Sequence, residues 1–599
     1  MATMTAPPTA KIAGGSFLIE TCPPDSVFTP EDFTDQHKLI AQTAEEFAIN
    51  EIVPNIEKME RKEFSVTREL VKKAGDLGLS AVDTPEAYSG LQMDKVTSAI
   101  IADRIARYGG FSATWGAHTC IGTLPIIYFG TEEQKKKYLP RLAAGEIVGA
   151  YALSEASSAS DSLNCRTRAE LSPDGKYYIL NGEKMWITNA AFADLFTVFA
   201  KVNGEKFTAF LIERSFPGFT VGPEEHKMGI RGSSTCPLIL ADCKVPVENV
   251  LGEIGKGHHI AFNVLNVGRF KLGAGCVGAS RVCIEGAIGY AKQRKAFGKV
   301  IADFGLIRQK LANMAAGIFT GESMAYRTVG MMDSAIAALG EAHTTDMPSV
   351  RKVIDEYSIE CSILKVWGSE LLDFVVDEMV QIYGGYGFVE EYPAECIYRD
   401  SRVNRIFEGT NEINRLVITG FLLKRAMSGQ LPLMPAIKKL MDEVLSGPGA
   451  GDEGFGPLAE EQKLAAAAKK MGLFAAGVAT QKYMQGIQDQ QEIMGAIADM
   501  VIETYAMESA VLRSQKLVAR NGEAESGLAI AMAQVYLAGA IEKIESAARK
   551  IVAAVSEGDM LRSQMAIIRR LGKHEPFNTI ALRQKIAQKM IEAGKYVTA

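Results

Sequence analysis

The spacing of apolar residues is helical between residues 30 and 149, and it predicts a helical N-terminal domain. Thr131 followed by Gln134 is typical of a capping box, so we expect a helix to begin there and to end before Gly145. The apolar positions that open the pattern are Phe33, Leu39, Ile40, Phe47 and Ile52.

Between residues 150 and 252 the period changes to two, which predicts a β domain. The Asn181-Gly182 pair favours a two-residue hairpin turn between the first two strands. Short strands joined by such turns predict an antiparallel sheet or a small barrel. The runs that carry the pattern are 177–180, 184–188, 196–200 and 207–212.

From residue 253 to about residue 430 the helical period returns, which predicts a helical bundle. We expect Gly384 and Gly385 to end one of its helices, because glycine is common after the last helical residue. The expected inner face of that helix consists of Leu364, Trp367, Leu371, Phe374 and Val375.

Residues 431–458 are expected to be a linker, because 446–454 is rich in glycine. Beyond it, residues 459–599 contain alanine-rich runs, such as 462–483 and 528–555, that favour helices. We find no repeat of fixed period. The order is therefore helices, strands, helices, linker and helices.

The composition is that of an ordinary soluble globular protein, with 47% hydrophobic and 23% charged residues. A length of 599 residues exceeds what one hydrophobic core supports, so several domains are expected. The net charge of -6 gives no electrostatic reason to expect a nucleic acid partner.

Nine cysteines are scattered without a C-x-x-C pair, which favours reduced thiols over disulfides or a zinc site. No metal is expected, because the seven histidines, including the pair His258 and His259, lack the spacing of metal ligands.

No uninterrupted apolar run approaches the roughly 18 residues of a membrane span. Residues 1–20 contain one lysine and no arginine, so no leader is evident. These features favour a bacterial cytoplasm, or a mitochondrion if a leader has been removed.

The segment Phe407-Glu408-Gly409-Thr410-Asn411 contains the strongest candidate for chemistry. Apolar neighbours would partly desolvate the Glu408 carboxylate, which raises its pKa and makes it a better base. The alternative is a helix cap, in which Thr410 and Asn411 satisfy free backbone N–H groups.

The order of these motifs, a glycine pair after a helix and then Phe407 to Asn411, resembles the acyl-CoA dehydrogenase family. The resemblance covers about residues 30–428 and implies a mostly helical α+β fold. In this fold a β-barrel-like middle domain lies between helical domains, with FAD at the junction. Residues 1–29 would be an N-terminal extension, and 459–599 an additional helical domain.

The resemblance also implies a set of flavin contacts. Residues 151–161 look like the family's Thr-Glu-Pro-x-x-Gly-Ser-Asp element, although Ala156 and Ala159 replace its proline and glycine. Trp186 would pack on the ring system and Thr188 would bond near N5, whereas an isolated aromatic in a strand is usually a core residue. The other implied contacts in this region are Tyr151, Leu153, Ser154 and Ser160.

Arg294 and Phe297 resemble the family's Arg-x-x-Phe-Gly motif, which contacts the pyrophosphate and adenosine of FAD across a subunit boundary. Without the family context, such a basic cluster is more often a solvated surface. The remaining implied FAD contacts are Gln381, Gly384, Gly385, Thr410 and Glu412. We reject a dinucleotide fingerprint at Gly273, Gly275 and Gly278, because a helical rather than a strand pattern precedes it.

By the same resemblance, Glu408 would remove the α proton of an acyl-CoA while the β hydride passes to the flavin, leaving a trans-2-enoyl-CoA. Ser160 and Arg269 would contact the CoA portion, and Phe407 and Gly409 the substrate. Some relatives carry the base at the position of Gly268, which leaves Glu408 without a rival here.

The helices after Pro448 resemble the very-long-chain branch of the family, as do 303–307 and Ser157-Ser158. This branch implies a homodimer acting on long-chain acyl-CoA in fatty-acid β-oxidation, and it allows a peripheral membrane contact. Gly116 and Ala117 would leave room for a long chain. The expected electron acceptor is electron-transferring flavoprotein. The alternatives are an acyl-CoA oxidase that uses O2 and a non-catalytic acyl-CoA-binding or assembly scaffold.

Overall fold

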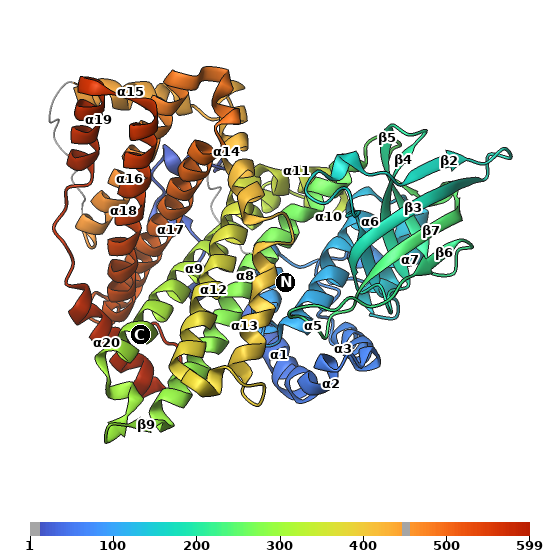
Figure 1. The fold of residues 1–599 in the computed structure, drawn as a ribbon, viewed down its shortest axis with the longest axis horizontal. Helices are drawn as coiled ribbons and strands as arrows, with labels where there is room; N and C mark the ends of the chain where they lie inside the picture. The colour runs from blue at the N-terminus through green and yellow to red at the C-terminus, as the bar shows by residue number, and fades with distance from the viewer. Residues whose placement is uncertain (1–11, 446–455) are drawn as a thin grey trace.

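The computed structural model describes residues 12–445 and 456–599 (Figure 1). The glycine-rich stretch 446–454 of the predicted linker lies outside these ranges. The preceding part of the predicted linker is wrong, because Leu433–Leu445 forms helix α15. Its apolar positions recur at helical spacing, and this pattern outweighed the neighbouring glycines.

The N-terminal domain is helical, as predicted. Thr131 caps α7, and its hydroxyl accepts a hydrogen bond from the backbone N–H of Gln134. The glutamine side chain bonds back to the backbone of Thr131, so the predicted capping box is confirmed. The helices are α1 (Asp35–Phe47), α2 (Ile56–Glu60), α3 (Phe64–Asp76), α4 (Lys95–Arg104), α5 (Gly109–Gly116), α6 (Leu124–Phe129) and α7 (Glu132–Ala143).

The middle domain is a mixed sheet with the strand order β6-β7-β3-β2-β4-β5-β8, and β1 also pairs with β4. Most pairs are antiparallel, whereas β4 runs parallel to both β1 and β2. The strands are β1 (Gly149–Ala152), β2 (Arg168–Leu171), β3 (Tyr177–Thr188), β4 (Leu195–Val202), β5 (Lys206–Glu213), β6 (Phe219–Val221), β7 (Thr235–Pro246) and β8 (Val250–Leu251).

The predicted hairpin at Asn181-Gly182 is wrong, because β3 runs through it as one strand with a register shift. The Asn181 side chain pairs with Asp242 on β7, donating from Nδ2 over 3.1 Å and accepting from the backbone N–H over 2.9 Å. A Cβ atom on Gly182 would lie 2.7 Å from the hydroxyl of Thr167. The glycine therefore serves a bulge and a close approach rather than a turn.

The central bundle is built on long helices. As predicted, α12 ends at Gly384, which has a φ of 60°. Phe374 was wrongly placed on its inner face: it is 39% exposed, whereas the other four residues of that stripe are buried, because Phe374 lies at the edge of the stripe. The elements are α8 (Gly257–Gln293), β9 (Lys295–Ala296), β10 (Lys299–Val300), α9 (Gly305–Ala337), α10 (Ala342–Thr345), α11 (Met347–Glu356), α12 (Ser358–Tyr383), α13 (Pro393–Ser401) and α14 (Asn411–Met427).

The glycines of α8 allow close helix packing, as predicted. A Cβ atom on Gly273 would lie 2.8 Å from the carbonyl oxygen of Leu364, and one on Gly278 would lie 2.1 Å from that of Asp103. Because they lie in the middle of α8 and not in a turn between a strand and the start of a helix, the dinucleotide-binding interpretation is excluded.

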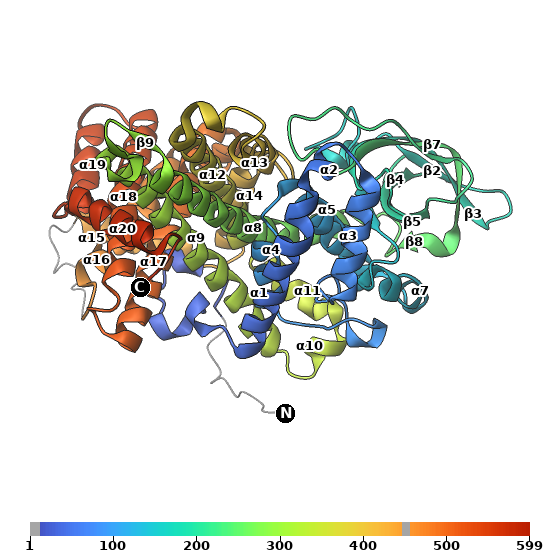
Figure 2. The same ribbon diagram turned by 90° about the horizontal axis from the view of Figure 1, so that it is seen from below.

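The C-terminal helices pack against α9 and α14, at the end of the bundle opposite the sheet (Figures 1 and 2). Within the described ranges, only α18 is long and apolar enough to cross a membrane. Its contacts with α9, α16, α17 and α20 are those of a core helix. The helices are α16 (Ala459–Tyr483), α17 (Gln491–Asn521), α18 (Gly527–Val555), α19 (Gly558–Leu571) and α20 (Thr579–Ala593).

Candidate active site

Glu408 lies in a tight turn immediately before α14. Both Glu408, with a φ of 58°, and Gly409, with a φ of 81°, have left-handed backbone conformations. Such a conformation is uncommon for glutamate and is typical of functional sites. Thr410 does cap α14, since its hydroxyl accepts a hydrogen bond from the N–H of Ile413 over 3.3 Å. The helix-cap interpretation therefore explains Thr410, but it leaves the strained Glu408 unexplained.

Three side chains from three helices hold the carbonyl groups of this turn. Lys365 of α12 donates to the carbonyl oxygen of Gly409 over 2.6 Å. Asn414 of α14 donates to the same oxygen over 2.8 Å. Arg269 of α8 donates to the carbonyl oxygen of Glu408 over 3.3 Å. These bonds compensate for the unfavourable backbone conformation.

The Glu408 carboxylate is desolvated but not tied to a donor. The residue as a whole is partly exposed, yet Oε2 is buried and has no hydrogen-bond partner in the described part of the chain. Burial raises the pKa of Glu408, and the nearby charges of Arg269 and Lys365 oppose this shift. Burial also lowers the pKa of Lys365, to about 8. A carboxylate in this state is suited to accept a proton.

A cavity of about 150 Å³ extends from Glu408 between α4, α5 and α8. Phe407 and Thr188 also line it, so the structure brings these two candidate residues to the base. A Cβ atom on Gly116 would meet no atom within 4 Å, so this glycine borders open space. The small residues of the wall are Ala102, Ala106, Gly109, Ala113, Gly116, Ala117, Gly275 and Ala279.

Trp186 is not a core residue. It lies in the second register shift of β3, has a φ of 58°, and is 56% exposed. The backbone carbonyl of Ser154 accepts a hydrogen bond from the N–H of Met185 over 2.9 Å, which places the 151–161 loop beside this bulge. Trp186 therefore presents its ring to the surface two residues from Thr188.

Glu155 fixes the path of this loop, despite the alanines at positions 156 and 159. Its carboxylate accepts hydrogen bonds from Lys184 over 2.7 Å and from the hydroxyl of Thr167 over 2.5 Å. Leu153 and Ser154 are partly exposed just before it, whereas Ser160 is exposed after it. Tyr151 is buried, and its hydroxyl donates to the carbonyl oxygen of Ala261 over 3.3 Å.

Models of the acyl-CoA dehydrogenase N-terminal, middle and C-terminal domains match residues 34–146, 150–243 and 255–423, and a further C-terminal model matches 467–570. A probable acyl-CoA dehydrogenase of Bacillus subtilis is 49% identical over 97% of this chain and 98% of its own. The chain belongs to the acyl-CoA dehydrogenase family.

Two further relatives extend this likeness. The human mitochondrial very long-chain specific acyl-CoA dehydrogenase is 37% identical over 74% of this chain and 69% of its own length. The crystal structure of a Bacillus anthracis acyl-CoA dehydrogenase complexed with FAD has a TM-score of 0.96 and 50% identity, and it covers 98% of this chain and 100% of that one.

The residues of this dehydrogenase fit FAD, its cofactor. A flavin ring needs an accessible flat surface beside the reacting groups. Thr188 lines the cavity of Glu408, and Trp186, two residues before it, has an exposed side chain. A dinucleotide also needs exposed cationic and aromatic groups for its phosphates and adenosine. Arg294 is exposed, with its guanidinium 5.5 Å from the ring centre of Tyr386, and Phe297 is 96% exposed.

These last residues lie far from the cavity of their own chain. Arg294 and Phe297 belong to the β9–β10 hairpin region, which Figure 1 places at the end of the bundle opposite the sheet. Gln381, Gly384 and Gly385 are exposed at the end of α12. Within one protomer, the predicted flavin-ring contacts therefore lie far from the predicted phosphate and adenine contacts.

Arg269 differs from its expected position. It is 7% exposed, and its guanidinium donates to the carbonyl oxygen of Glu408. Arg269 is therefore buried beneath the turn and not at a surface where the CoA portion could contact it. Thr410 and Glu412 begin α14, where Glu412 is exposed and Thr410 caps the helix. Neither side chain lines the cavity of Glu408.

Sequence reasoning missed Lys365 and Asn414. Lys365 is fully buried, and it is the cation in the otherwise apolar run Ile363-Leu364-Lys365-Val366-Trp367. A lysine inside an apolar helix face is the signal that could have identified it, because such lysines are rarely buried without a partner. No comparable signal marks Asn414.

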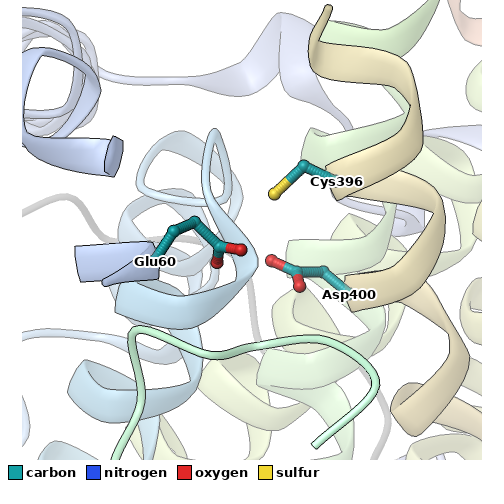
Figure 3. Close-up of side chains that lie close together, drawn as sticks. All are labelled: Glu60, Cys396 and Asp400. Carbon is teal, nitrogen blue, oxygen red and sulfur yellow. The ribbon is translucent and has the colours of Figure 1, made fainter. Parts of the chain in front are cut away.

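Glu60, Cys396 and Asp400 lie together beside the cavity, with their ligand atoms within 4.8 Å of one another (Figure 3). Both carboxylates already have protein donors. Glu60 accepts from the hydroxyl of Tyr108 over 2.6 Å and from Arg399 over 3.3 Å, and Asp400 accepts from the backbone N–H of Ile230.

Asp400 is 4% exposed and its Oδ2 has no partner among the described residues. Burial, reinforced by the negative charge of Glu60, raises the pKa of Asp400 to about 7. The Arg399 guanidinium supplies the positive charge that a bound cation would otherwise provide. We therefore interpret the cluster as a buried carboxyl pair that joins α2 to α13.

Proposed function

We propose that the protein oxidises long-chain acyl-CoA to trans-2-enoyl-CoA with Glu408 as the catalytic base. The observation that carries this proposal is Oε2 of Glu408, which is buried, has no hydrogen-bond partner in residues 12–445 and 456–599, and lies at a cavity walled by small residues. A carboxylate fixed by its backbone but free at its oxygen can accept a proton without first breaking a salt bridge.

The bound FAD supplies the acceptor for the hydride that leaves the β carbon. Glu408 takes the α proton, which is acidic only when the thioester carbonyl is polarised. The backbone N–H of Glu408 is the donor that the chain itself offers to that carbonyl oxygen. Phe407 and Gly409 flank the reacting carbons, and Thr188 orients the ring that faces them.

The size of the cavity wall residues supports a long substrate. Gly116 and Ala117 line the cavity, and bulky side chains at these positions would fill it. The very-long-chain relative supports the same preference. The role in fatty-acid β-oxidation, with electrons passing to electron-transferring flavoprotein, belongs to this proposal.

The assembly that fits the proposal is a homodimer. Because Arg294 and Phe297 are remote from the cavity of their own chain, they are suited to bind the phosphates and adenosine of a neighbour's FAD. Ser160 would meet the CoA portion at the exposed edge of its loop. We propose a cytoplasmic location, with at most a peripheral membrane contact.

The proposal is tested by anaerobic bleaching of the flavin spectrum with acyl-CoAs of graded chain length. Fast bleaching by long chains supports it, and fastest bleaching by butyryl-CoA contradicts the chain-length preference. Stoichiometric peroxide in air would identify the oxidase alternative. If no acyl-CoA in the series bleaches the flavin, the result would favour a binding or assembly scaffold.

A further inference from the structure

We propose that Lys365 is a positioning residue for the base: its ammonium group holds the Glu408–Gly409 turn and keeps the carboxylate ionised without bonding to it. This inference rests on the proposed function, because it assigns a role relative to proton removal by Glu408. It gives a function to a charged residue that is fully buried within the bundle.

Lys365 donates hydrogen bonds to a backbone carbonyl of the turn and to a side chain at the start of α14. It donates to the carbonyl oxygen of Gly409 over 2.6 Å and to Oδ1 of Asn411 over 2.7 Å. Asn411 is itself fixed, because its Nδ2 donates to the hydroxyl of Ser369 over 3.1 Å. The ammonium therefore connects α12 to the first and third residues after the base.

The same geometry keeps the lysine away from the proton acceptor. Oε2 of Glu408 has no partner among the described residues, so Lys365 acts on it through space rather than by a salt bridge. A direct salt bridge would make the carboxylate a much weaker base. A cation held one residue away stabilises the ionised form while leaving the oxygen free to accept a proton.

Lys365 and Arg269 are the two cations that act on the buried Glu408 carboxylate. Burial raises the pKa of the thiols and of the phenol in its surroundings, so these groups stay neutral. The titratable groups that face the site or line its cavity are Arg269, Lys271 and Cys276 on α8, Lys365 on α12, Asp400 on α13, Glu412 on α14, Tyr151 on β1 and Cys120 after α5.

A Lys365→Met variant of the FAD-bound protein tests the charge. It keeps the length and apolar stem of the side chain but removes the cation and its hydrogen bonds. We expect the rate of anaerobic flavin reduction to rise with pH as Glu408 ionises, and the midpoint of this rise to move up by about one pH unit in the variant. Lys365→Arg retains the charge and should restore the midpoint even where a changed geometry slows the reaction.

Two variants separate charge from structure. Asn414→Ala removes a donor to the Gly409 carbonyl without changing charge, so it should slow reduction and leave the midpoint in place. Ser369→Ala disturbs the same Asn411 side chain and should also leave the midpoint unchanged. An unchanged midpoint in Lys365→Met, or an equal shift in Ser369→Ala, would overturn the proposal.

An infrared titration of the oxidised holoenzyme gives a readout that needs no substrate. The carbonyl band of protonated Glu408, assigned by its loss in Glu408→Gln, should persist to higher pH in Lys365→Met than in the native protein. If no acyl-CoA bleaches the native flavin, the proposed function fails while this titration still tests Lys365. If bleaching occurs and the band does not shift, only the role of Lys365 fails.

Discussion

Oε2 of Glu408 lies 3.0 Å from the position that a Cβ atom would occupy on Gly268. This distance is shorter than an ordinary contact between carbon and oxygen, so α8 leaves space for the carboxylate by lacking a side chain there. The position of the Glu408 carboxylate therefore depends on the glycine at position 268 of α8.

We expect Gly268→Ala to lower the rate of flavin reduction by roughly tenfold, because the methyl group displaces a carboxylate whose position limits the reaction. Gly289→Ala is the matched control on the same helix, since a Cβ atom there would meet nothing within 4 Å. Stopped-flow reduction of both variants checks the prediction. Equal rates in the two variants would show that Glu408 tolerates the displacement.

Glu408→Gln should retain bound FAD and lose reduction by acyl-CoA. The amide has the same size, but it cannot accept the α proton, so the rate should fall by at least roughly a thousandfold. The yellow colour of the purified variant and its anaerobic spectrum after substrate addition check both parts. Bleaching at the native rate would remove Glu408 from the role of base.

Arg294→Ala should weaken FAD retention more than it slows the reaction of the cofactor that stays bound. A guanidinium that contacts phosphate is remote from the reacting carbons, so its loss affects binding. FAD occupancy after extensive dialysis is the measurement, and Lys292→Ala, an exposed cation on the preceding turn, is the control. Full occupancy in Arg294→Ala would contradict the assignment.

The sequence predicted most of the fold because the hydrophobic periods of its segments are long and locally consistent. The helical domains, α7 with its capping box and the end of α12 at Gly384 all follow from local patterns. The hairpin at Asn181-Gly182 failed because a contact with Asp242 on another strand decides that conformation. Local sequence patterns do not reveal contacts between residues that are far apart in the sequence.

The candidate site was predictable at Glu408 and Thr188, which carry recognisable motifs. The position of Arg269 beneath the turn and the role of Lys365 were not, because both depend on how α8 and α12 pack around residues far away in sequence. The remoteness of Arg294 from the base is likewise a property of the assembled bundle.

Gly116→Leu should shorten the preferred substrate. Because nothing lies within 4 Å of a Cβ atom at this position, the new side chain would extend into the cavity instead of repacking the helix. We expect kcat/KM to fall by roughly tenfold or more for long-chain acyl-CoA, with a smaller loss for short chains. A uniform loss of kcat/KM across a chain-length series would show that the cavity does not hold the acyl chain.

Asp400→Asn should make stability less dependent on pH. The carboxyl pKa rises from its ordinary value of 3.8 to about 7 in the folded protein, so the folded state holds a proton that the unfolded state releases. The resulting stabilisation is fully present below about pH 4 and is lost as pH rises towards 7. An amide keeps the acceptor for Ile230 and carries no charge at any pH.

Between pH 5 and pH 8, native protein should therefore lose more stability than Asp400→Asn, by on the order of 2 kcal/mol. Apparent melting temperatures of the two FAD-bound proteins at both pH values measure this difference. Asp346→Asn is the control: hydrogen bonds from Ser349 lower the pKa of that partly exposed carboxyl, so it is ionised in both states across this interval. An equal pH response of native protein and Asp400→Asn would mean that Asp400 is already ionised at pH 5, which would contradict the raised pKa of this carboxyl.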